Sequence, residues 1–405
     1  MTDILIASRP ARIKPSPSMA ARALVSKLRA SGKDIVDFTL GEPDFDTPEH
    51  IIEGAFKAAL AGETRYTSPN GTRAMRDAVA AKFKRESGLD FTDDEIVISS
   101  GAKQLIFTAF TATLDEGDEV IVPAPYWVSY PDMAIVNGGE PVFVSCSENA
   151  GFKLTPDALE QAITPRTKWL VLNSPNNPTG AVYSRAELAA LAAVLRQHPQ
   201  VMVMTDEIYE HFVYDGEVAA AFVQVAPDLA DRTLTINGVS KAYAMTGWRI
   251  GYGAGPAKLI KAVANLLSQS TSCPSAVSQA AAVIALTGEQ GFVRQANAAY
   301  EVRRNLIVDR LNALPGVTCT RPAGSFYVYP NVSGLIGMRT AEGENIRSDL
   351  DVALFLLREA GVAVIDGSSY GLSPYLRISF ATSVEEIERG TDRMKQACQS
   401  LRRQR

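Results

Sequence analysis

The stretch Asn237-Gly-Val-Ser-Lys-Ala-Tyr-Ala-Met-Thr-Gly-Trp-Arg-Ile-Gly-Tyr252 carries the strongest signal in this chain. It places Lys241 among small residues and Arg249 shortly after it, in a segment punctuated by glycine. A lysine amine is useful to an enzyme chiefly when it forms a Schiff base, and the planar guanidinium of arginine suits a phosphate group. The pair therefore indicates pyridoxal phosphate. A structural loop with a surface lysine is the alternative that this stretch alone leaves open.

Composition places the chain among ordinary globular proteins. Its 405 residues are 46% hydrophobic and 21% charged, enough for two or three domain-sized cores. The net charge of −5 argues against an extended nucleic-acid surface. No apolar run approaches the ~20 residues of a membrane helix, and residues 1–17 lack the apolar core of a secretory signal.

The cysteines and histidines indicate neither a disulfide framework nor a metal centre. The four cysteines lie far apart without Cys-x-x-Cys spacing, which fits a reducing cytoplasm. The histidines His50, His198 and His211 form no ligand pair, so we expect no metal.

Short β-branched runs alternate with longer amphipathic stretches in the first part of the chain. The expected strands span residues 95–99, 119–122, 169–172, 201–204 and 233–236, and the helices between them include 103–113 and 185–196. Runs that are apolar throughout are typical of strands buried on both faces. The pattern predicts an α/β fold with a mainly parallel sheet and a ligand site at the carboxyl ends of its strands.

A different pattern follows in the last part of the chain. A helix is expected over residues 290–313, with a polar side formed by Arg294, Glu301, Arg303 and Arg304. Beyond it, the expected strands are 324–329, 362–365 and 375–379, and the expected helices are 349–359 and 384–398. We therefore expect a smaller α+β lobe, completed by an amino-terminal helix over residues 19–30.

Polar motifs follow the ends of the expected strands. Ser99-Ser-Gly-Ala-Lys-Gln104 opens a helix whose free N–H groups would attract a phosphate, although a plain N-cap by Ser99 or Ser100 is the commoner explanation. Asn173-Ser-Pro-Asn-Asn-Pro-Thr-Gly180 is a rigid loop from which Asn177 could present an amide donor.

Two further motifs carry charge. Thr205-Asp-Glu-Ile-Tyr209 sets Asp206 and Tyr209 beyond a buried strand, where the carboxylate is either a helix N-cap or a counter-charge for a cationic ring. Arg377 stands between Leu376 and Ile378 in an expected strand. It lies either on the wet face of that strand or in a site where it clamps a substrate carboxylate.

The ordered set of motifs resembles the class I aminotransferases, pyridoxal-phosphate enzymes of fold type I, and within them the bacterial aspartate and aspartate/prephenate branch. The motifs are Lys14-Pro-Ser16, Gly41-Glu-Pro-Asp-Phe-Asp-Thr-Pro48, Tyr66, Pro125-Tyr-Trp-Val-Ser-Tyr-Pro131, Asn176-Asn-Pro-Thr-Gly180, Asp206-Glu-Ile-Tyr209 and Tyr375-Leu-Arg-Ile-Ser379. Each is weak alone, but their order across nearly the whole chain is specific.

The resemblance implies the organisation of the molecule. A large domain over residues 49–295 would contain a mainly parallel seven-stranded sheet covered by helices. Residues 1–48 with 296–405 would form the small α+β domain, and the amino-terminal segment would contact the partner subunit of a homodimer. The enzyme would act on amino acids and 2-oxo acids in the cytoplasm, without nucleic acid or membrane partners.

The resemblance also gives roles at the cofactor ring. Lys241 would hold pyridoxal phosphate as a Schiff base and later act as the base that moves the α-proton. Asp206 would keep the pyridine nitrogen protonated. Tyr209 and Asn177 would hydrogen-bond the phenolic oxygen, and Trp127 would stack on the ring.

At the phosphate, the resemblance implies contacts from Arg249, Ser240 and the backbone N–H groups of Ala102 and Lys103. Tyr66 would reach the phosphate from the neighbouring subunit. One departure concerns the serine that many relatives carry three residues before the lysine, because Gly238 stands there in this chain. It leaves the number of phosphate contacts open.

The substrate would lie between two ends of the site. Arg377 would take the α-carboxylate, with Gly41 allowing close backbone approach and Asn177 and Trp127 nearby. Lys103 would take a distal carboxylate, and Ser18 would lie near the same end. This predicts transfer of an amino group from aspartate or glutamate to a 2-oxo acid such as 2-oxoglutarate.

Four alternatives are weighed at this stage. Prephenate or an aromatic amino acid could be the substrate of the same reaction, and Lys103 could be a solvated helix residue. Lyases and synthases of the same fold share the cofactor groups. A transcription regulator with an aminotransferase-like domain would need a DNA-binding segment, but the motifs begin within ~20 residues of Met1.

Overall fold

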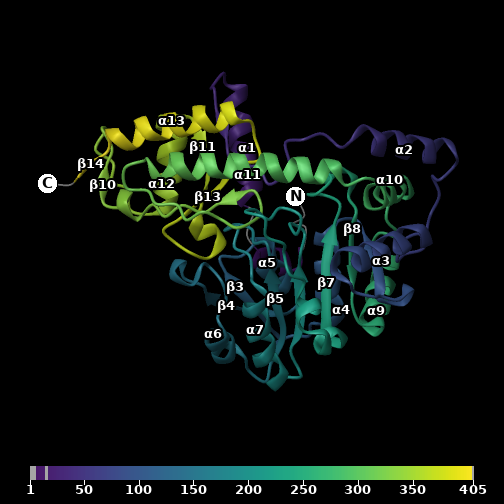
Figure 1. Ribbon diagram of the computed structural model, residues 1–405. Coiled ribbons are helices and arrows are strands. Elements are labelled where there is room, and N and C mark those ends of the chain that lie inside the picture. The colour runs from purple at the N-terminus through teal and green to yellow at the C-terminus, as the bar shows by residue number, and fades with distance from the viewer. Residues whose placement is uncertain (1–5, 14–16, 404–405) are drawn as a thin grey trace, which may run out of the picture.

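The computed structural model describes residues 6–13 and 17–403, apart from the side chain of Ser18. Two lobes share this part of the chain, one built on a large sheet and the other on small sheets and long helices (Figure 1). Within the described part, no helix is both long and apolar enough to cross a bilayer.

The large sheet has seven strands in the order β2-β8-β7-β6-β5-β3-β4. Their bounds are β2 (Ile96–Ser99), β3 (Glu119–Ala124), β4 (Glu140–Ser145), β5 (Thr167–Asn173), β6 (Met202–Asp206), β7 (Thr233–Gly238) and β8 (Gly251–Ala254). β8 is antiparallel to both its neighbours, and the other neighbouring pairs are parallel. The expected mainly parallel α/β sheet is confirmed, and all five expected strands belong to it.

Periodicity missed the two strands with the weakest apolar signal. β4 is an edge strand that contains Pro141, and each of its residues is exposed or only partly buried. β8 is short and contains Gly251 and Gly253, both of which lie against neighbouring backbone. Neither strand shows the continuous β-branched run that marks the centre of the sheet.

Helices cover both faces of the sheet, which explains the apolar strands. Along β5, Trp169 and Val171 join one buried cluster and Leu170 and Leu172 join another. The first cluster is packed under α4 (Ala102–Thr113), α5 (Ser129–Val136) and α9 (Ala257–Ser270); the second lies under α6 (Pro156–Ala162), α7 (Arg185–Gln197) and α8 (Phe222–Val225). A strand covered on both faces has no wet side, so its alternation disappears.

Three helices pack at the β2–β8 end of the sheet. They are α2 (Glu49–Leu60), α3 (Arg73–Ser87) and α10 (Ala276–Thr287). α2 lies at the outer edge of the molecule with α10 beneath it (Figure 1). One side of α2 is therefore left without cover from the described part of this chain.

The second lobe combines four main helices with small sheets. Its helices are α1 (Pro17–Ala30), α11 (Gly291–Asn312), α12 (Asp349–Phe355) and α13 (Val384–Ser400). Its sheets are β12 (Ile365–Asp366), β13 (Leu376–Ser379) and β9 (Tyr327–Val328); β1 (Val36–Asp37) with β11 (Val362–Ala363); and β10 (Met338–Arg339) with β14 (Arg402–Arg403). The predicted α+β character is confirmed.

Three expected elements of this lobe are shortened, divided or changed in helix type. The strand expected over 324–329 is reduced to β9, and the strand expected over 362–365 is divided between β11 and β12. The helix expected over 349–359 is α12 followed by a π-helical turn, Leu356–Ala360. Such short pairings are decided by neighbouring strands rather than by local propensity.

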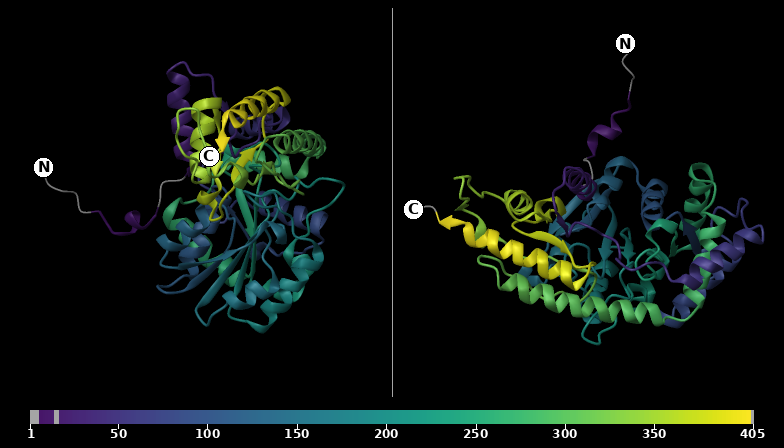
Figure 2. Two further views of the ribbon diagram at one scale, coloured as in Figure 1. Left: turned by 90° about the vertical axis from the view of Figure 1, so that its left-hand side faces the viewer. Right: turned by 90° about the horizontal axis from the view of Figure 1, so that it is seen from above.

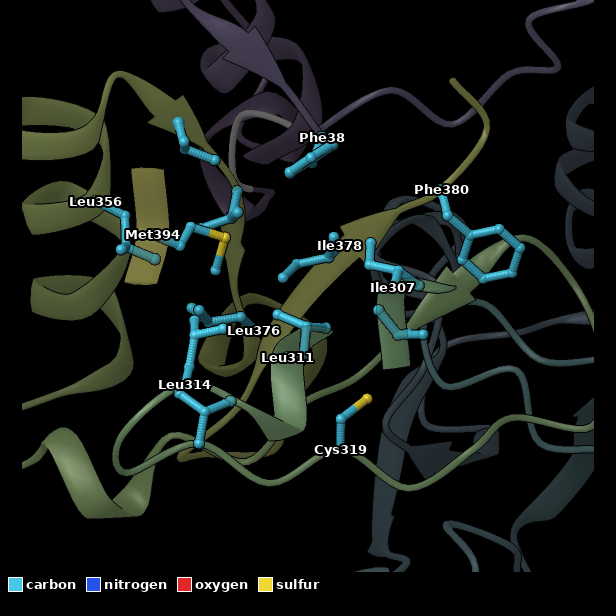
Figure 3. Close-up of a cluster of buried hydrophobic side chains, with 14 of the residues drawn as sticks. Phe38, Ile307, Leu311, Leu314, Cys319, Leu356, Leu376, Ile378, Phe380 and Met394 are labelled. Carbon is cyan, nitrogen blue, oxygen red and sulfur yellow. The ribbon is translucent and has the colours of Figure 1, made fainter. Parts of the chain in front are cut away.

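The core of the second lobe gathers side chains from distant parts of the sequence (Figure 3). Phe38, Leu311, Ile378 and Met394 lie in one cluster and are almost completely buried. Burying an aliphatic or aromatic side chain of this size contributes roughly 1.5–3 kcal/mol. This cluster fixes β13 and β9, the two strands that carry side chains into the site described below.

One sequence prediction for α11 is wrong. The helical pattern predicts Arg304 on the polar side, but its side chain is completely buried. Its guanidinium binds both carboxylate oxygens of Asp215, at 2.6 and 2.8 Å, and lies over the ring of Tyr214. α11 runs from the sheet lobe to the second lobe (Figure 2), so a face that periodicity assigns to solvent is covered by protein.

Candidate active site

A cavity of about 310 Å³ opens at the carboxyl ends of the parallel strands, with walls from both lobes. That volume lies at the lower end of the range for small-molecule sites. It is lined by eleven residues singled out from the sequence: Gly41, Ala102, Lys103, Trp127, Asn177, Asp206, Tyr209, Ser240, Lys241, Arg249 and Arg377. Groups separated by more than 300 positions are thus brought to one place.

Lys241 follows β7 and lies at the wall of this cavity. Its Nζ donates to the carbonyl oxygen of Gly41 at 2.5 Å and lies 5.8 Å from the ring centre of Tyr209. Burial lowers the pKa of the amine to about 8, against the opposing effect of Glu42. Lys241 therefore reaches its neutral, nucleophilic form at a lower pH than a surface lysine.

Asp206 is the last residue of β6 and is almost completely buried. Its Oδ2 accepts from the hydroxyl of Tyr130 at 2.6 Å, and its Oδ1 accepts from the backbone N–H of Ile208 at 3.3 Å. A turn rather than a helix follows it, so the N-cap alternative is wrong. Burial raises the pKa of this carboxyl. A cation bound next to Asp206 in the cavity would lower that pKa.

Arg377 is buried, which excludes the wet-face alternative. Only 2% of the residue is exposed. Its Nη2 donates to the carbonyl of Thr39 at 2.6 Å and its Nη1 to the Oδ1 of Asn177 at 3.4 Å. Its Nε has no hydrogen-bond partner among the described residues. A buried guanidinium with spare donors that lines a cavity fits a carboxylate ligand.

Asn177 and Tyr209 lie beside this arginine. Because the oxygen of Asn177 faces Arg377, its amide NH₂ is left as the donor group. The hydroxyl of Tyr209 lies 3.0 Å from that of Tyr327, a residue of the second lobe that also lines the cavity.

The start of α4 forms a separate end of the site. Its N-cap is Gly101, with φ of 94° and no side-chain cap, so the expected alternative of a serine cap is wrong. A Cβ at Gly101 would lie 2.2 Å from Nη2 of Arg249. Glycine thus allows the guanidinium to reach the uncapped helix start, where free N–H groups and a cation fit a phosphate.

Lys103 is exposed but is held at the wall of the cavity. Its Nζ lies 4.7 Å from the ring centre of Trp127, and partial desolvation of the ammonium together with the charge of Arg249 lowers its pKa. A freely solvated helix lysine would show neither feature.

The structure does not bring every predicted residue to this cavity. Tyr66 is 90% exposed and does not line it. The side chain of Ser18 and the motif residues 14–16 lie outside the described residues, although Met19 lines the cavity. Gly238 does not line the cavity either. A Cβ at this position would lie 3.0 Å from the carbonyl oxygen of Ile250, so position 238 is packed against the start of β8.

Sequence reasoning missed two tyrosines of the site. Tyr130 lies within the quoted motif 125–131, three residues after Trp127, and its hydroxyl binds Asp206. Tyr327 lies in the expected strand 324–329 and touches Tyr209. In each case a hydroxyl next to a predicted residue is a tertiary contact that sequence spacing does not reveal.

A second cavity of about 320 Å³ lies on the other side of the turn that follows β6. Glu86, Glu210 and His211 approach one another there closely enough to share a metal ion. The ammonium of Lys82, however, already contacts both carboxylates, at 3.3 Å from Glu86 and closer to Glu210. An ammonium of the chain itself thus already lies between the two carboxylates of this group and compensates part of their charge.

The geometry of the first cavity fits pyridoxal phosphate. It combines a lysine amine of lowered pKa, a buried carboxylate, an uncapped helix start beside the exposed Arg249, and the buried guanidinium of Arg377 with an unused donor. These are the groups needed to hold an aldehyde, a pyridine nitrogen, a phosphate and a carboxylate.

A family model and the similar proteins both indicate one family of enzymes. The model for "Aminotransferase class I and II" matches residues 33–394. An aspartate/prephenate aminotransferase of Cereibacter sphaeroides is 51% identical, over 96% of this chain and 98% of that protein.

Solved structures extend the similarity to the fold. The crystal structure of an aspartate aminotransferase from Rhizobium meliloti superposes with a TM-score of 0.97 at 48% identity, covering 99% of this chain and 100% of that one. An aspartate aminotransferase from Thermus thermophilus with maleate gives 0.91 at 43% identity, covering 98% and 100%.

Proposed function

The chain belongs to the class I and II aminotransferases, and from this we propose that it transfers the amino group of aspartate or glutamate to a 2-oxo acid such as 2-oxoglutarate. The observation that carries the proposal is a single cavity containing Lys241 and a buried Arg377 with an unused donor. The family implies pyridoxal phosphate as the cofactor.

We assign the cofactor contacts from the fit of the cavity. Lys241 would bind the cofactor covalently, and Arg249, Ser240 and the start of α4 at Ala102 and Lys103 would hold its phosphate. When bound, pyridoxal phosphate supplies a ring that takes up the electron pair of the broken Cα–H bond.

The remaining groups act on the ring. Asp206, fixed by Tyr130, would keep the proton on the ring nitrogen. Tyr209 and Asn177 would donate to the phenolic oxygen, and Trp127 would cover the ring face.

Arg377 and Lys241 would then perform the chemical step on the amino acid. Arg377 would bind the α-carboxylate, beside the backbone of Gly41, and so fix the direction of the Cα–H bond. The Nζ of Lys241 would take the proton from Cα and deliver it to the C4′ carbon of the cofactor. An amine with a pKa of about 8 is able to accept and return a proton near neutral pH.

Specificity would depend on Lys103. Its ammonium at the cavity wall offers a second cation to the distal carboxylate of aspartate or glutamate. The similar Thermus thermophilus enzyme was solved with maleate, which is also a dicarboxylate, and this supports a site with two cationic ends. Ser18 stays a proposed neighbour of this end.

Prephenate is the second candidate substrate, because the similar Cereibacter protein is described as an aspartate/prephenate aminotransferase. Its carboxylate could use the same lysine. A panel of amino donors and 2-oxo acceptors with purified enzyme tests both. Turnover of aspartate with 2-oxoglutarate is expected, and amino-group loss without an acceptor would instead indicate a lyase.

We propose that the enzyme is a homodimer with shared sites. Tyr66 is exposed and away from the cavity of its own chain, so it is available to a partner's phosphate. Ile52, Phe56 and Leu60 form an exposed apolar row on α2, spaced by four residues. Mixing Tyr66 and Lys241 variants should restore about a quarter of the sites by random pairing, if each site draws these groups from opposite chains.

The proposed domains are residues 49–295 and residues 1–48 with 296–405. Along α11, Val293 packs into the core near β2 and β8, whereas Ala296 packs into the core of the second lobe. This change of partner supports a boundary near residue 295. The four free cysteines support a cytoplasmic location.

A further inference from the structure

Tyr327 is a buried residue of the active-site cavity to which the proposed mechanism gives no role. It is the first residue of β9, is completely buried and lines the cavity. Its hydroxyl oxygen lies 3.0 Å from that of Tyr209, and its ring centre lies 4.8 Å from the guanidinium carbon of Arg377. One side chain therefore touches both the group assigned to the cofactor ring and the group assigned to the substrate carboxylate.

Strand pairing explains this position. In the antiparallel pair of β9 and β13, Tyr327 stands opposite Ser379. Arg377 is two residues from Ser379 and so lies on the same face, diagonal to Tyr327. The tyrosine ring and the guanidinium are thus held against each other by the backbone of one sheet.

The hydroxyl of Tyr327 is fixed from a second direction. A Cβ added at Gly41 would lie 3.0 Å from it, so the hydroxyl packs against the Gly41 backbone, whose carbonyl accepts from Lys241. The charged groups that act on this tyrosine are Arg377 and Glu42. Tyr327 therefore lies at the junction of Lys241, Tyr209 and Arg377.

We propose that Tyr327 is a positioning residue that directs the proton of Tyr209 into the cavity and holds the guanidinium of Arg377 by its ring. Each phenol has one proton, so Tyr209 can donate to the phenolic oxygen of the cofactor only while its own oxygen accepts from Tyr327 or from none. The ring of Tyr327 meanwhile restrains Arg377 by a cation–π contact. This inference rests on the proposed function.

The two contacts are separated by two substitutions. Tyr327→Phe keeps the ring and removes the hydroxyl, whereas Tyr327→Leu removes both. The readouts are the pH titration of the visible absorbance of the cofactor-loaded protein and the binding of succinate, a dicarboxylate without an amino group. Neither measurement depends on turnover of a substrate.

Tyr327→Phe should raise the midpoint of the absorbance titration by about 0.5 to 1 pH unit, because Tyr209 becomes a weaker donor to the phenolic oxygen. Its succinate dissociation constant should stay within about twofold of wild type, since the ring over Arg377 remains. Tyr327→Leu should show the same shift and bind succinate about three- to thirtyfold more weakly. The ring of Tyr370, 5.1 Å from the guanidinium carbon of Arg377, remains in both variants and limits the loss.

Tyr329→Phe is the matched control. It removes a buried hydroxyl two residues along the same segment, which donates to the carbonyls of Gly367 and Leu372 and does not line the cavity. This control should leave the titration and succinate binding unchanged. An unchanged midpoint in Tyr327→Phe, or an equal shift in both phenylalanine variants, would overturn the proposal. Wild-type protein without cofactor absorbance would instead reject the proposed function.

Discussion

Two lysines on opposite sides of one turn have pKa values that are shifted in opposite directions. After β6, Asp206 and Tyr209 face the active-site cavity with Lys241, whereas Glu207 and Glu210 face the second cavity, where Glu210 binds Lys82. Burial lowers the pKa of Lys241 to about 8. The pKa of Lys82 is raised, because the carboxylates of Glu210 and Glu86 outweigh its burial.

The difference in pKa follows from the partners and not from the depth, since Lys82 is the more deeply buried of the two lysines. Lys82 contacts Glu86 and Glu210, and Asn237 donates to the same oxygen of Glu210 at 2.6 Å. Lys241 has a neutral carbonyl as its hydrogen-bond acceptor. A buried lysine with carboxylate partners is a structural charge, and one without them is a reactive amine.

The largest effect is expected from removing Lys241, the lysine that we propose binds the cofactor. Lys241→Ala should reduce turnover by at least about three orders of magnitude, because the covalent attachment and the proton-transfer base are both lost. The free energy of unfolding of the cofactor-free protein should change little, since the hydrogen bond that is lost joins the amine to a backbone carbonyl and not to a carboxylate. Steady-state rates and denaturant unfolding measure the two quantities. Near-normal turnover in this variant would contradict the assignment.

The next largest effect is expected from Asp206, the proposed counter-charge of the ring nitrogen. Asp206→Asn should fold and take up cofactor but slow the abstraction of the α-proton by several orders of magnitude, because the ring nitrogen loses the partner that keeps it protonated. Single-turnover stopped flow with aspartate measures this step. A rate within threefold of wild type would show that Asp206 has a structural role only.

Removing Lys82, the lysine with carboxylate partners, should affect stability more than turnover. Lys82→Met should lower the free energy of unfolding by about 2–4 kcal/mol, because the partly buried Glu210 and Glu86 lose the ammonium that contacts both of them. Adding Glu210→Gln should recover part of this loss, which controls for lost packing. Turnover per folded, cofactor-loaded molecule is expected to fall far less than in Lys241→Ala. Equal losses of turnover would erase the distinction between the two lysines.

A smaller effect is expected at the substrate end. Lys103→Ala should lower kcat/KM for aspartate and glutamate by about ten- to a hundredfold more than for alanine, because only dicarboxylates lose a charge-assisted contact of about 1.5–3 kcal/mol. Cofactor affinity is measured in the same variant, since Lys103 lies at the start of α4. A loss shared equally by all donors would leave Lys103 without a role in specificity.

The smallest expected effect is the pH dependence of cofactor attachment. A lowered amine pKa favours the neutral form, so the rate at which cofactor-free protein binds pyridoxal phosphate covalently should rise with pH and level off above about 8. By contrast, the reaction rate of a simple alkylamine in solution, whose pKa is about 10.4, keeps rising with pH over the same range. A rate that still rises well above about pH 9 would show that Lys241 is an ordinary lysine.

Local sequence determined much of the fold. The apolar runs at β5, β6 and β7 were recognisable because strands buried on both faces need no alternation. β4 and β8 were not recognisable, because exposure at the edge and glycine within the strand remove that signal. The polar side assigned to Arg304 was wrong because helical periodicity records which residues share a face, and not what covers it.

The sequence by itself singled out Lys241, Asp206, Arg249 and Arg377 through the order of their motifs, and the fold brings all four to the lining of one cavity. Only the tertiary structure decided their hydrogen-bond partners, the lowered pKa of Lys241 and the raised pKa of Asp206. Tyr130 and Tyr327 come to Asp206 and Tyr209 across long stretches of chain. The opposite pKa shifts of Lys82 and Lys241 likewise depend on the charges and the burial that folding places around each amine.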